Sequence, residues 1–417
     1  MRNKLSRHRL APILAAIGPG IIAANADNDA GGITTYSLAG AHFGYSLIWV
    51  LILITFSLGV TQEMGARMGM VTGKGFGGLI REKFGARWAA FAILIMLLAN
   101  IGTTTAEFSG IASSLEIFGI SKYISIPLSV IGVFMLVARY DYRRVQRVFL
   151  IISMLYLSYV ASGFLARPNW NEALVSIVKP DIQWNLPYLI MFVGVVGTTI
   201  TPWGQFFIQS YVVDKRLRAK DLPYARADVY VGAFFTDFIA FFIIVACAAK
   251  IYPLVMQGFK IEDAADVALA LQPLAGRFAS ILFGIGLLNA SLLGAVILPL
   301  TSSYATAETF GWEAGLDKTP REAPIFFGLF LFFLLIPSLI VLIPGLPLLH
   351  FMFYPQVLNG ILLPIILIFV LKITNDQFFM GEYTNSRAFN IIALITTIGL
   401  IILTILLLAT PLIQRYA

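Results

Sequence analysis

The chain has 417 residues, of which 59% are hydrophobic and only 12% are charged, and its mean hydropathy is +0.85. Soluble domains carry about 25% charged residues, so this composition excludes an ordinary soluble domain and indicates a chain surrounded by lipid. The net charge of +7 does not indicate nucleic-acid binding, because the basic residues lie in loops between apolar segments. A single cysteine, Cys247, excludes a disulfide within the chain, and three scattered histidines do not suggest a metal cluster.

Apolar segments follow one another along the whole chain. A helix needs about 20 apolar residues to cross the hydrocarbon core, and only helices can bond every backbone group there. The sequence therefore predicts an all-α membrane protein with about eleven transmembrane helices. Their approximate ranges are 12–40, 43–66, 88–117, 121–138, 147–166, 187–212, 229–252, 275–307, 324–343, 348–371 and 389–413. The basic N-terminus MRNKLSRHRL resembles a signal peptide, but no convincing cleavage site follows, so we expect a retained first helix.

The loop charges predict the orientation. Lys and Arg are concentrated in the N-terminus and in the loops after the second, fourth and sixth segments, which would all lie on one face of the membrane. The opposite face has the acidic stretch Glu262, Asp263 and Asp266. The positive-inside rule places the N-terminus in the cytoplasm, and an odd number of spans places the C-terminus outside. We therefore expect a multi-pass protein of the cell membrane.

The first segment is interrupted near its middle by the polar stretch NADNDAGGITT, residues 25–35. Glycine weakens a helix by about 1 kcal/mol per residue, so the pair Gly31 and Gly32 favours a discontinuous helix. The free carbonyls that end its first half, beside the Asp29 carboxylate, would form a cation site. The alternative is a kink in which hydrogen bonds from neighbouring helices hold the aspartates.

The sixth segment contains GTTITPWGQ, residues 197–205, where Pro202 removes a backbone donor and breaks the helix. Taken alone, this is compatible with an ordinary proline kink. Two broken helices five spans apart, however, are typical of inverted repeats that enclose a transport site. We therefore predict one transporter domain over residues 1–417, with repeats at about 12–166 and 187–371 and an extra helix at about 389–413.

Several stretches resemble the Nramp family of divalent metal transporters, over essentially the full length. They are GPGIIAANADNDAGG, AGAHFGYSLIWVLIL and MGMVTGK early in the chain, GVVGTTITPW in segment six and YPQVLNGILLP in segment ten. The resemblance implies a LeuT-type 5+5 inverted repeat with discontinuous helices 1 and 6. It also implies a secondary transporter that imports divalent metal as its substrate and needs no cofactor.

The chain departs from the family pattern at the metal-binding motifs. The Asp-Pro-Gly-Asn motif of the first helix reads Asp29-Ala30-Gly31-Gly32 here, and Met-Pro-His in the sixth helix reads Thr201-Pro202-Trp203. In the third helix, the aspartate that usually precedes the family glutamate by three residues is Thr104, and the glutamate is Glu107. The asparagine and thioether ligands are thus lost, while the first aspartate is kept.

These departures predict a preference for hard cations. Sulfur ligands favour transition metals, whereas oxygen ligands favour Mg²⁺, Ca²⁺ and Mn²⁺. Mg²⁺ also tends to keep several of its waters, so a wider site suits it. The pattern resembles the Nramp-related magnesium transporters (NRMT), a divergent branch of the family, and predicts import of Mg²⁺, and also Mn²⁺, by alternating access.

Four residues are predicted to form the metal site directly. We expect Asp29 to be the anionic ligand and Thr201 to contribute its hydroxyl. The resemblance implies that Thr198 contributes a backbone carbonyl, in the place of a family alanine, and that Gly32 leaves space where the family has its asparagine.

Three further residues are candidates near the metal. Gln356 matches a family glutamine close to the site, although an interhelical hydrogen bond would also explain it. Glu107 is expected to hold water next to the ion. Asn25, one turn before Asp29, is a weaker candidate because it could instead cap the broken helix. Trp203 is most simply a packing residue, whereas Glu63 and Glu308, close to span ends, are expected to reach water.

The missing proton carriers predict weak or no proton coupling. Family members couple metal uptake to protons through the acid pair of the third helix and the histidine of the sixth. Thr104 and Trp203 cannot carry a proton, although Glu107 and Asp27 remain alternatives. The membrane potential would then drive uptake of a divalent cation by roughly 4.6 kcal/mol per 100 mV, twice the single-charge value.

Other functions remain as alternatives. A proton-coupled Mn²⁺ or Fe²⁺ importer is the first, and Thr201 in place of methionine argues against it. An amino-acid transporter of the same fold is the second, but the Asp29 carboxylate would repel the carboxylate of the substrate. A channel is the third. No enzyme signature, nucleic-acid site or obligate protein partner is evident, so the expected partners are the cation and the lipid bilayer.

Overall fold

The computed structural model describes residues 28–139, 153–316 and 318–416, and every regular element in these ranges is a helix. The helices of the first half are α3 (Ala30–Phe43), α4 (Ile48–Thr72), α5 (Phe76–Phe84), α6 (Ala86–Glu116), α7 (Lys122–Arg139), η1 (Ser153–Tyr156), α9 (Leu157–Leu165) and α10 (Trp170–Val178). Those of the second half are α11 (Leu186–Thr199), α12 (Pro202–Asp214), η2 (Ala219–Asp221), α13 (Leu222–Lys250), α14 (Tyr252–Met256), α15 (Ala264–Val267), η3 (Ala268–Leu271), α16 (Gln272–Ala275), η4 (Gly276–Phe278), α17 (Ala279–Phe310), α18 (Pro324–Val341), α19 (Leu348–Thr374), α20 (Gln377–Met380), η5 (Gly381–Tyr383) and α21 (Arg387–Tyr416).

The predicted spans correspond to these helices. Within the described ranges, 8 helices are long and apolar enough to cross a membrane, and Lys122–Ala138 is a shorter apolar helix. The predicted first and fifth spans are described only in part, as α3 and as η1 with α9. The all-helical membrane architecture expected from the hydropathy pattern is therefore confirmed.

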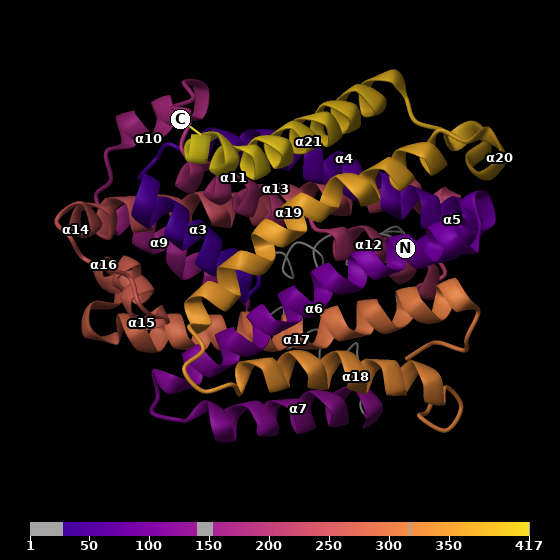
Figure 1. Ribbon diagram of the computed structural model, residues 1–417, viewed down its shortest axis with the longest axis horizontal. Coiled ribbons are helices and arrows are strands. Elements are labelled where there is room, and N and C mark those ends of the chain that lie inside the picture. The colour runs from indigo at the N-terminus through magenta and orange to yellow at the C-terminus, as the bar shows by residue number, and fades with distance from the viewer. Residues whose placement is uncertain (1–27, 140–152, 317, 417) are drawn as a thin grey trace, which may run out of the picture.

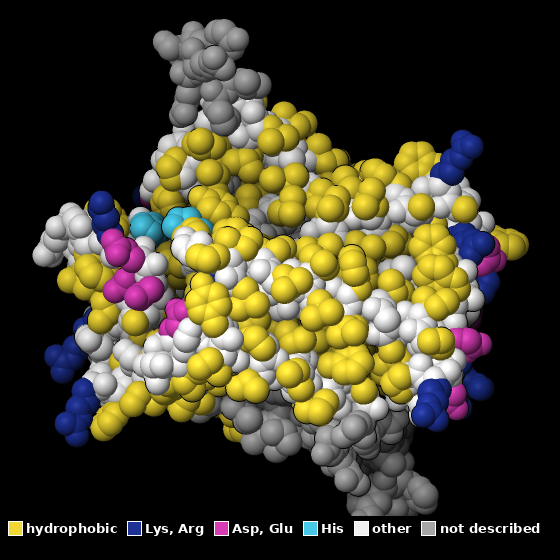
Figure 2. Space-filling model, turned by 60° about the horizontal axis from the view of Figure 1, so that its bottom comes forward, with side chains coloured by type: hydrophobic (Ala, Val, Ile, Leu, Met, Phe, Trp, Pro, Cys, Tyr) yellow, Lys and Arg dark blue, Asp and Glu magenta, His cyan; other side chains and the backbone are white. Residues whose placement is uncertain are grey.

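The molecule has two ends of different character, between which the long helices run (Figure 1). One end carries α14, α15 and α16, and we call it the acidic end after Glu116, Glu262, Asp263 and Asp266. The opposite end carries α5 and α20, and we call it the basic end. Its Lys and Arg residues include Lys74, Arg81, Lys83, Lys215, Arg216, Arg218 and Lys220. In Figure 2 the surface between the ends is mostly apolar, as a bilayer-facing surface should be.

Close helix contacts place α3 in the middle of the bundle. An added Cβ at Gly40 of α3 would lie 2.4 Å from the Ile244 carbonyl oxygen of α13. At Gly197 of α11, it would lie 2.3 Å from the Gly360 nitrogen of α19. Small residues allow such approaches, which drive helix association in lipid. Because α3 packs against α11, α13 and α19, it lies among these helices inside the bundle.

The expectation that Glu63 reaches water is wrong. Glu63 is 0% exposed and forms salt bridges with Arg67 at 3.0 Å and with Arg226 at 2.8 Å. Arg67 also donates to the Tyr383 carbonyl and to the Asn385 side chain, so this buried ion cluster joins α4 and α13 to the segment before α21. Pairing the charges offsets the free-energy cost of removing them from water. A glutamate that reached water would not need such partners. Glu308 is only half-buried, and its carboxylate accepts a hydrogen bond from Ser210.

Candidate cation site at two broken helices

The first half of the site is the start of α3. Asp29 is its N-cap, and the Asp29 carboxylate accepts a hydrogen bond of 2.6 Å from the Gly32 amide. Aspartate is a preferred N-cap because it satisfies backbone donors that the helix cannot. The side chain is only 3% exposed, so a carboxylate is held at a helix start deep inside the protein. Gly32 contributes its backbone amide, while Asn25 and Asp27 lie outside the described residues.

A second carboxyl group lies next to the first. Glu107 of α6 is 0% exposed, and the Ala30 amide donates to its Oε2 at 3.4 Å. The carboxyl groups of Glu107 and Asp29 interact with one another. Gly294 of α17 makes room for this arrangement, because an added Cβ there would lie 2.5 Å from Glu107 Oε2. Two neighbouring carboxyl groups in a water-poor interior favour a bound cation or proton.

The second break lies where the sequence predicts it. The helix α11 ends at Thr199, and α12 begins at Pro202 with Thr201 as its N-cap. The Thr201 hydroxyl accepts a hydrogen bond of 3.1 Å from the Gly204 amide, which leaves a second oxygen lone pair for another partner. The last carbonyls of α11, including that of Thr198, have no partner further along the helix. The buried Thr198 hydroxyl also has no partner among the described residues.

Gln356 of α19 lies between the two breaks. An added Cβ at Gly31 would lie 1.8 Å from Gln356 Nε2, so this amide packs directly over the backbone of α3. The backbone carbonyl oxygen of Gln356 would be 2.1 Å from an added Cβ at Gly197, one residue before Thr198. Gln356 Nε2 is buried and unpartnered in the described part of the chain. The structure thus brings Asp29, Gln356 and Thr198 into one region.

Two supporting residues were not predicted from the sequence. Asn359 donates to Gln356 Oε1 at 3.0 Å and to the Thr103 hydroxyl of α6, also at 3.0 Å. These hydrogen bonds orient the side-chain amide of Gln356, because Asn359 binds its oxygen and its nitrogen has no partner in the described part of the chain. The signal was an asparagine three residues after Gln356 in an apolar span, a spacing that places both side chains on one helix face.

Two tyrosines tie the breaks to their surroundings. The hydroxyls of Tyr36 of α3 and Thr199 of α11 are 2.6 Å apart, which links the two broken helices directly. Tyr156 donates to the Asn28 carbonyl at 2.8 Å, immediately before the Asp29 cap. These contacts hold the chain just before α3 and at the end of α11, so neighbouring helices position both segments.

Three further residues contact groups other than the carboxyl pair. Trp203 is buried and packs against Phe207, as expected of a packing residue. Thr104 donates to the Asn100 carbonyl of its own helix and carries no ionisable group. Asp237 is buried in α13 beside Thr55 of α4, outside the region of Asp29.

The donor set is rich in oxygen and poor in carboxylates. Among the described residues, no three His, Cys, Asp or Glu side chains are close enough to hold a metal ion together. A cation at Asp29 would therefore be bound by one or two carboxylates together with neutral oxygens and water, as Mg²⁺ usually is. Met352 lies one turn before Gln356 in α19, and its sulfur accepts a hydrogen bond of 3.5 Å from the Thr34 hydroxyl.

A helix that starts at a buried carboxylate and a second helix that is broken at Pro202, in a bundle with an apolar belt, are typical of a LeuT-type membrane transporter. Solved structures agree with this class. The manganese transporter of Eremococcus coleocola is similar with a TM-score of 0.75 and 18% identity, covering 95% of this chain and 86% of that one. MhsT, solved with L-phenylalanine, is similar with a TM-score of 0.61 and 16% identity, covering 96% and 98%.

Sequence comparisons identify the family. Residues 20–410 match the Nramp family, described as natural resistance-associated macrophage protein-like. The divalent metal cation transporter MntH of Caldanaerobacter subterraneus subsp. tengcongensis is 26% identical over 410 residues, covering 96% of this chain and 94% of that protein. MntH of Erwinia tasmaniensis is 26% identical over 385 residues, covering 89% of each. The chain belongs to the Nramp family, and it is a multi-pass membrane transporter rather than an enzyme.

Proposed function

We propose that this chain imports divalent cations by alternating access, prefers Mg²⁺, also accepts Mn²⁺, and couples weakly or not at all to protons. One observation carries the proposal: Asp29 lies buried among oxygen donors, and threonine replaces the family methionine at position 201. The names of the relatives support a divalent metal as the cargo, and the oxygen-rich donor set supports a hard ion.

The charge distribution supports an orientation of the chain in the membrane. The basic end would face the cytoplasm by the positive-inside rule, and the acidic end would face outside. We assign the first repeat to about 12–166 and the second to about 187–371, so that Asp29 and Thr201 occupy equivalent breaks. The extra helix at about 389–413 corresponds to α21.

Competition between Mg²⁺ and Mn²⁺ tests the cargo. In proteoliposomes with the wild-type chain, we expect excess Mg²⁺ to suppress Mn²⁺ uptake strongly. In Thr201→Met, a thioether replaces the hydroxyl, and we expect at least a tenfold weaker suppression because the sulfur favours Mn²⁺. Thr236→Met, in α13, is a control for adding a methionine to a buried position. Suppression that is absent in the wild type would contradict the Mg²⁺ preference.

Intravesicular pH tests the coupling. We expect Mg²⁺ uptake driven by an inside-negative potential to leave the internal pH unchanged, because Thr104 and Trp203 carry no transferable proton. A pH-sensitive dye inside the vesicles would follow this during uptake. Acidification in proportion to uptake would support the second candidate, a proton-coupled Mn²⁺ or Fe²⁺ importer, which the buried Glu107 favours. An amino-acid substrate is disfavoured, because the Asp29 carboxylate would repel its carboxylate.

A further inference from the structure

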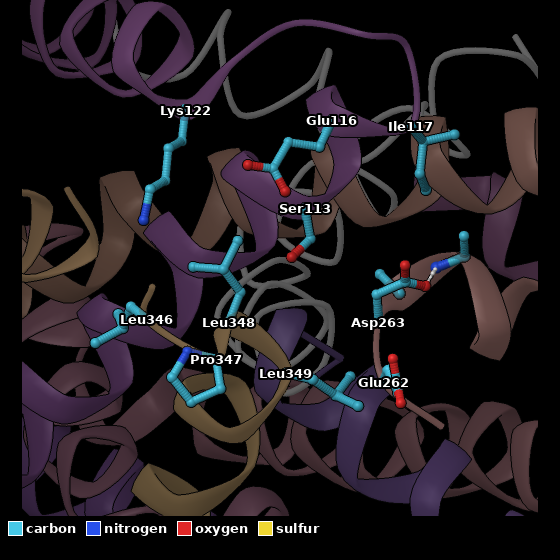
Figure 3. Close-up of a pocket in the computed structure, with 12 residues that line it drawn as sticks. Ser113, Glu116, Ile117, Lys122, Glu262, Asp263, Leu346, Pro347, Leu348 and Leu349 are labelled. Carbon is cyan, nitrogen blue, oxygen red and sulfur yellow. Dashed lines mark hydrogen bonds between the residues drawn. The ribbon is translucent and has the colours of Figure 1, made fainter. Parts of the chain in front are cut away.

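A cavity of about 350 Å³ lies at the acidic end, separate from the Asp29 site. It forms where the end of α6, the segment before α15 and the segment before α19 meet (Figure 3). It is lined by Ser113, Glu116, Ile117 and Lys122 and by residues 262–265 and 346–349. Three chain segments that are far apart in sequence thus enclose one outward-facing hollow.

The cavity carries a net negative charge. Glu116, Glu262 and Asp263 contribute three carboxylates to its lining, and Lys122 contributes one ammonium, which leaves −2. The Lys122 ammonium is already committed, because it donates to the Val341 carbonyl at 2.9 Å and to the Ile343 carbonyl at 2.8 Å. Glu116 interacts electrostatically with both Lys122 and Asp263. The net charge therefore matches that of one divalent cation.

A buried hydroxyl points into the same cavity. Ser113 is only 8% exposed, and its side chain has no hydrogen bond in the described part of the chain. Its neighbours behave differently, because Ser109 and Ser114 donate to carbonyls of their own helix. In Figure 3 the Ser113 side chain lies between those of Glu116 and Asp263, with its oxygen on the side of Leu348. A polar group kept free at this depth costs free energy unless water or a ligand satisfies it.

We propose that this cavity, which we call the outer vestibule, binds a hydrated divalent cation before it reaches the Asp29 site. The side chains would not coordinate the ion directly, because no three carboxylates in the described residues converge on one point. Mg²⁺ dehydrates reluctantly and keeps several waters, so the carboxylates would hold it through those waters. At about 30 Å³ per water, six waters fill roughly 180 Å³, which the vestibule accommodates.

Free oxygen atoms are available to hold those waters. Asp263 Oδ1 accepts from the Ala265 and Asp266 amides, but its second oxygen makes no such bond. The Glu116 and Glu262 carboxylates have no hydrogen bonds in the described ranges. Together with the Ser113 hydroxyl, they surround the cavity with acceptors for water protons.

The vestibule shares a lining residue with a second cavity that borders α3. Leu349 lines both the vestibule and a second cavity of about 510 Å³, which also contacts Leu38 and His42 of α3. A cleft with a net charge raises the local concentration of its counter-ion. The outer vestibule would thereby increase the capture rate at low external cation. That the captured ion is the transported one rests on the proposed function, whereas the ability of the outer vestibule to bind a divalent cation does not.

Mn²⁺ binding to the purified full-length protein, followed by electron paramagnetic resonance, tests the site itself. In Asp29→Ala we expect one remaining, weaker site. We expect the added changes Glu116→Gln, Glu262→Gln and Asp263→Asn to abolish it, while asparagine preserves the Asp263 cap. Glu172→Gln with Asp181→Asn removes charge at the same end, outside the vestibule, and should leave the site intact. Binding that survives the triple change would overturn the proposal, whatever the transported ion proves to be.

Uptake kinetics test the role of the site. With Asp29 intact, the triple change should raise the half-saturating Mg²⁺ concentration about tenfold with an unchanged maximal rate, and high salt should shrink the difference. Ser113→Ala should act in the same direction with a smaller effect and little risk to folding. A triple variant that matches the Glu172→Gln, Asp181→Asn control in half-saturation would overturn this role.

Discussion

Asp29→Asn should reduce the initial rate of Mg²⁺ uptake into proteoliposomes by at least about a hundredfold. Asparagine is as good an N-cap as aspartate, so α3 should still begin at Ala30 and only the charge is lost. One unit charge 4 Å from another contributes about 4 kcal/mol at an effective dielectric constant of 20, and a divalent ion feels it twice. A tenfold change in affinity corresponds to about 1.4 kcal/mol, so a large loss is expected even after strong screening.

Asp237→Asn is the matched control for Asp29→Asn. It also removes a buried carboxylate from a membrane helix, but Asp237 lies in α13 beside Thr55 and away from the two breaks. We expect its uptake, normalised to folded protein, to stay within about threefold of the wild type. Undiminished Mg²⁺ and Mn²⁺ transport by Asp29→Asn would remove the central role of this carboxylate. An equal loss in both variants would point to a general effect of buried charge.

Glu63→Gln should destabilise the protein by about 3–5 kcal/mol, because it leaves Arg67 buried without its counter-charge. Glutamine keeps the shape of the side chain, so the effect reports the charge rather than a cavity. Thermal unfolding of the purified protein in detergent would measure it as a lower midpoint.

Glu82→Gln provides the matched control for this second prediction. It removes the same charge from the Lys74–Glu82 salt bridge, whose side chains are 51% and 42% exposed. Exposed pairs contribute about 0–1 kcal/mol, so the midpoint should barely change. Equal midpoints for Glu63→Gln and Glu82→Gln would show that the cluster around Arg67 does not hold α4, α13 and the segment before α21 together.

Local chemistry made the breaks predictable. One helix ends at Thr199 and the next begins at Pro202, because proline lacks the amide donor that would continue the first helix. Thr201 caps the start of the second helix. Asp29, with Gly31 and Gly32 shortly after it, marks the start of α3 in the same way. Such signals depend on residues close together in the chain, so they can be read without knowing which helices are neighbours.

Side-chain direction was not predictable, and the errors concentrate there. In a membrane helix that is apolar on nearly all sides, hydrophobic periodicity does not say which face meets the protein. The expectation that Glu63 reaches water failed for this reason, because Arg226, far along the chain, pairs with it. The support of Gln356 by Asn359 and Thr103 was missed for the same reason.

The sequence by itself determined the membrane class, the start of α3 at Asp29, the break at Pro202 and the residue types at both places. Hydropathy, proline, glycine and capping residues act over a few positions, so each leaves a local pattern. Only the tertiary structure decided that Glu107 lies against Asp29, that Gln356 spans the two breaks and that three distant segments enclose the outer vestibule. These arrangements depend on how closely glycines let helices approach and how each helix is rotated, which are properties of the packed bundle.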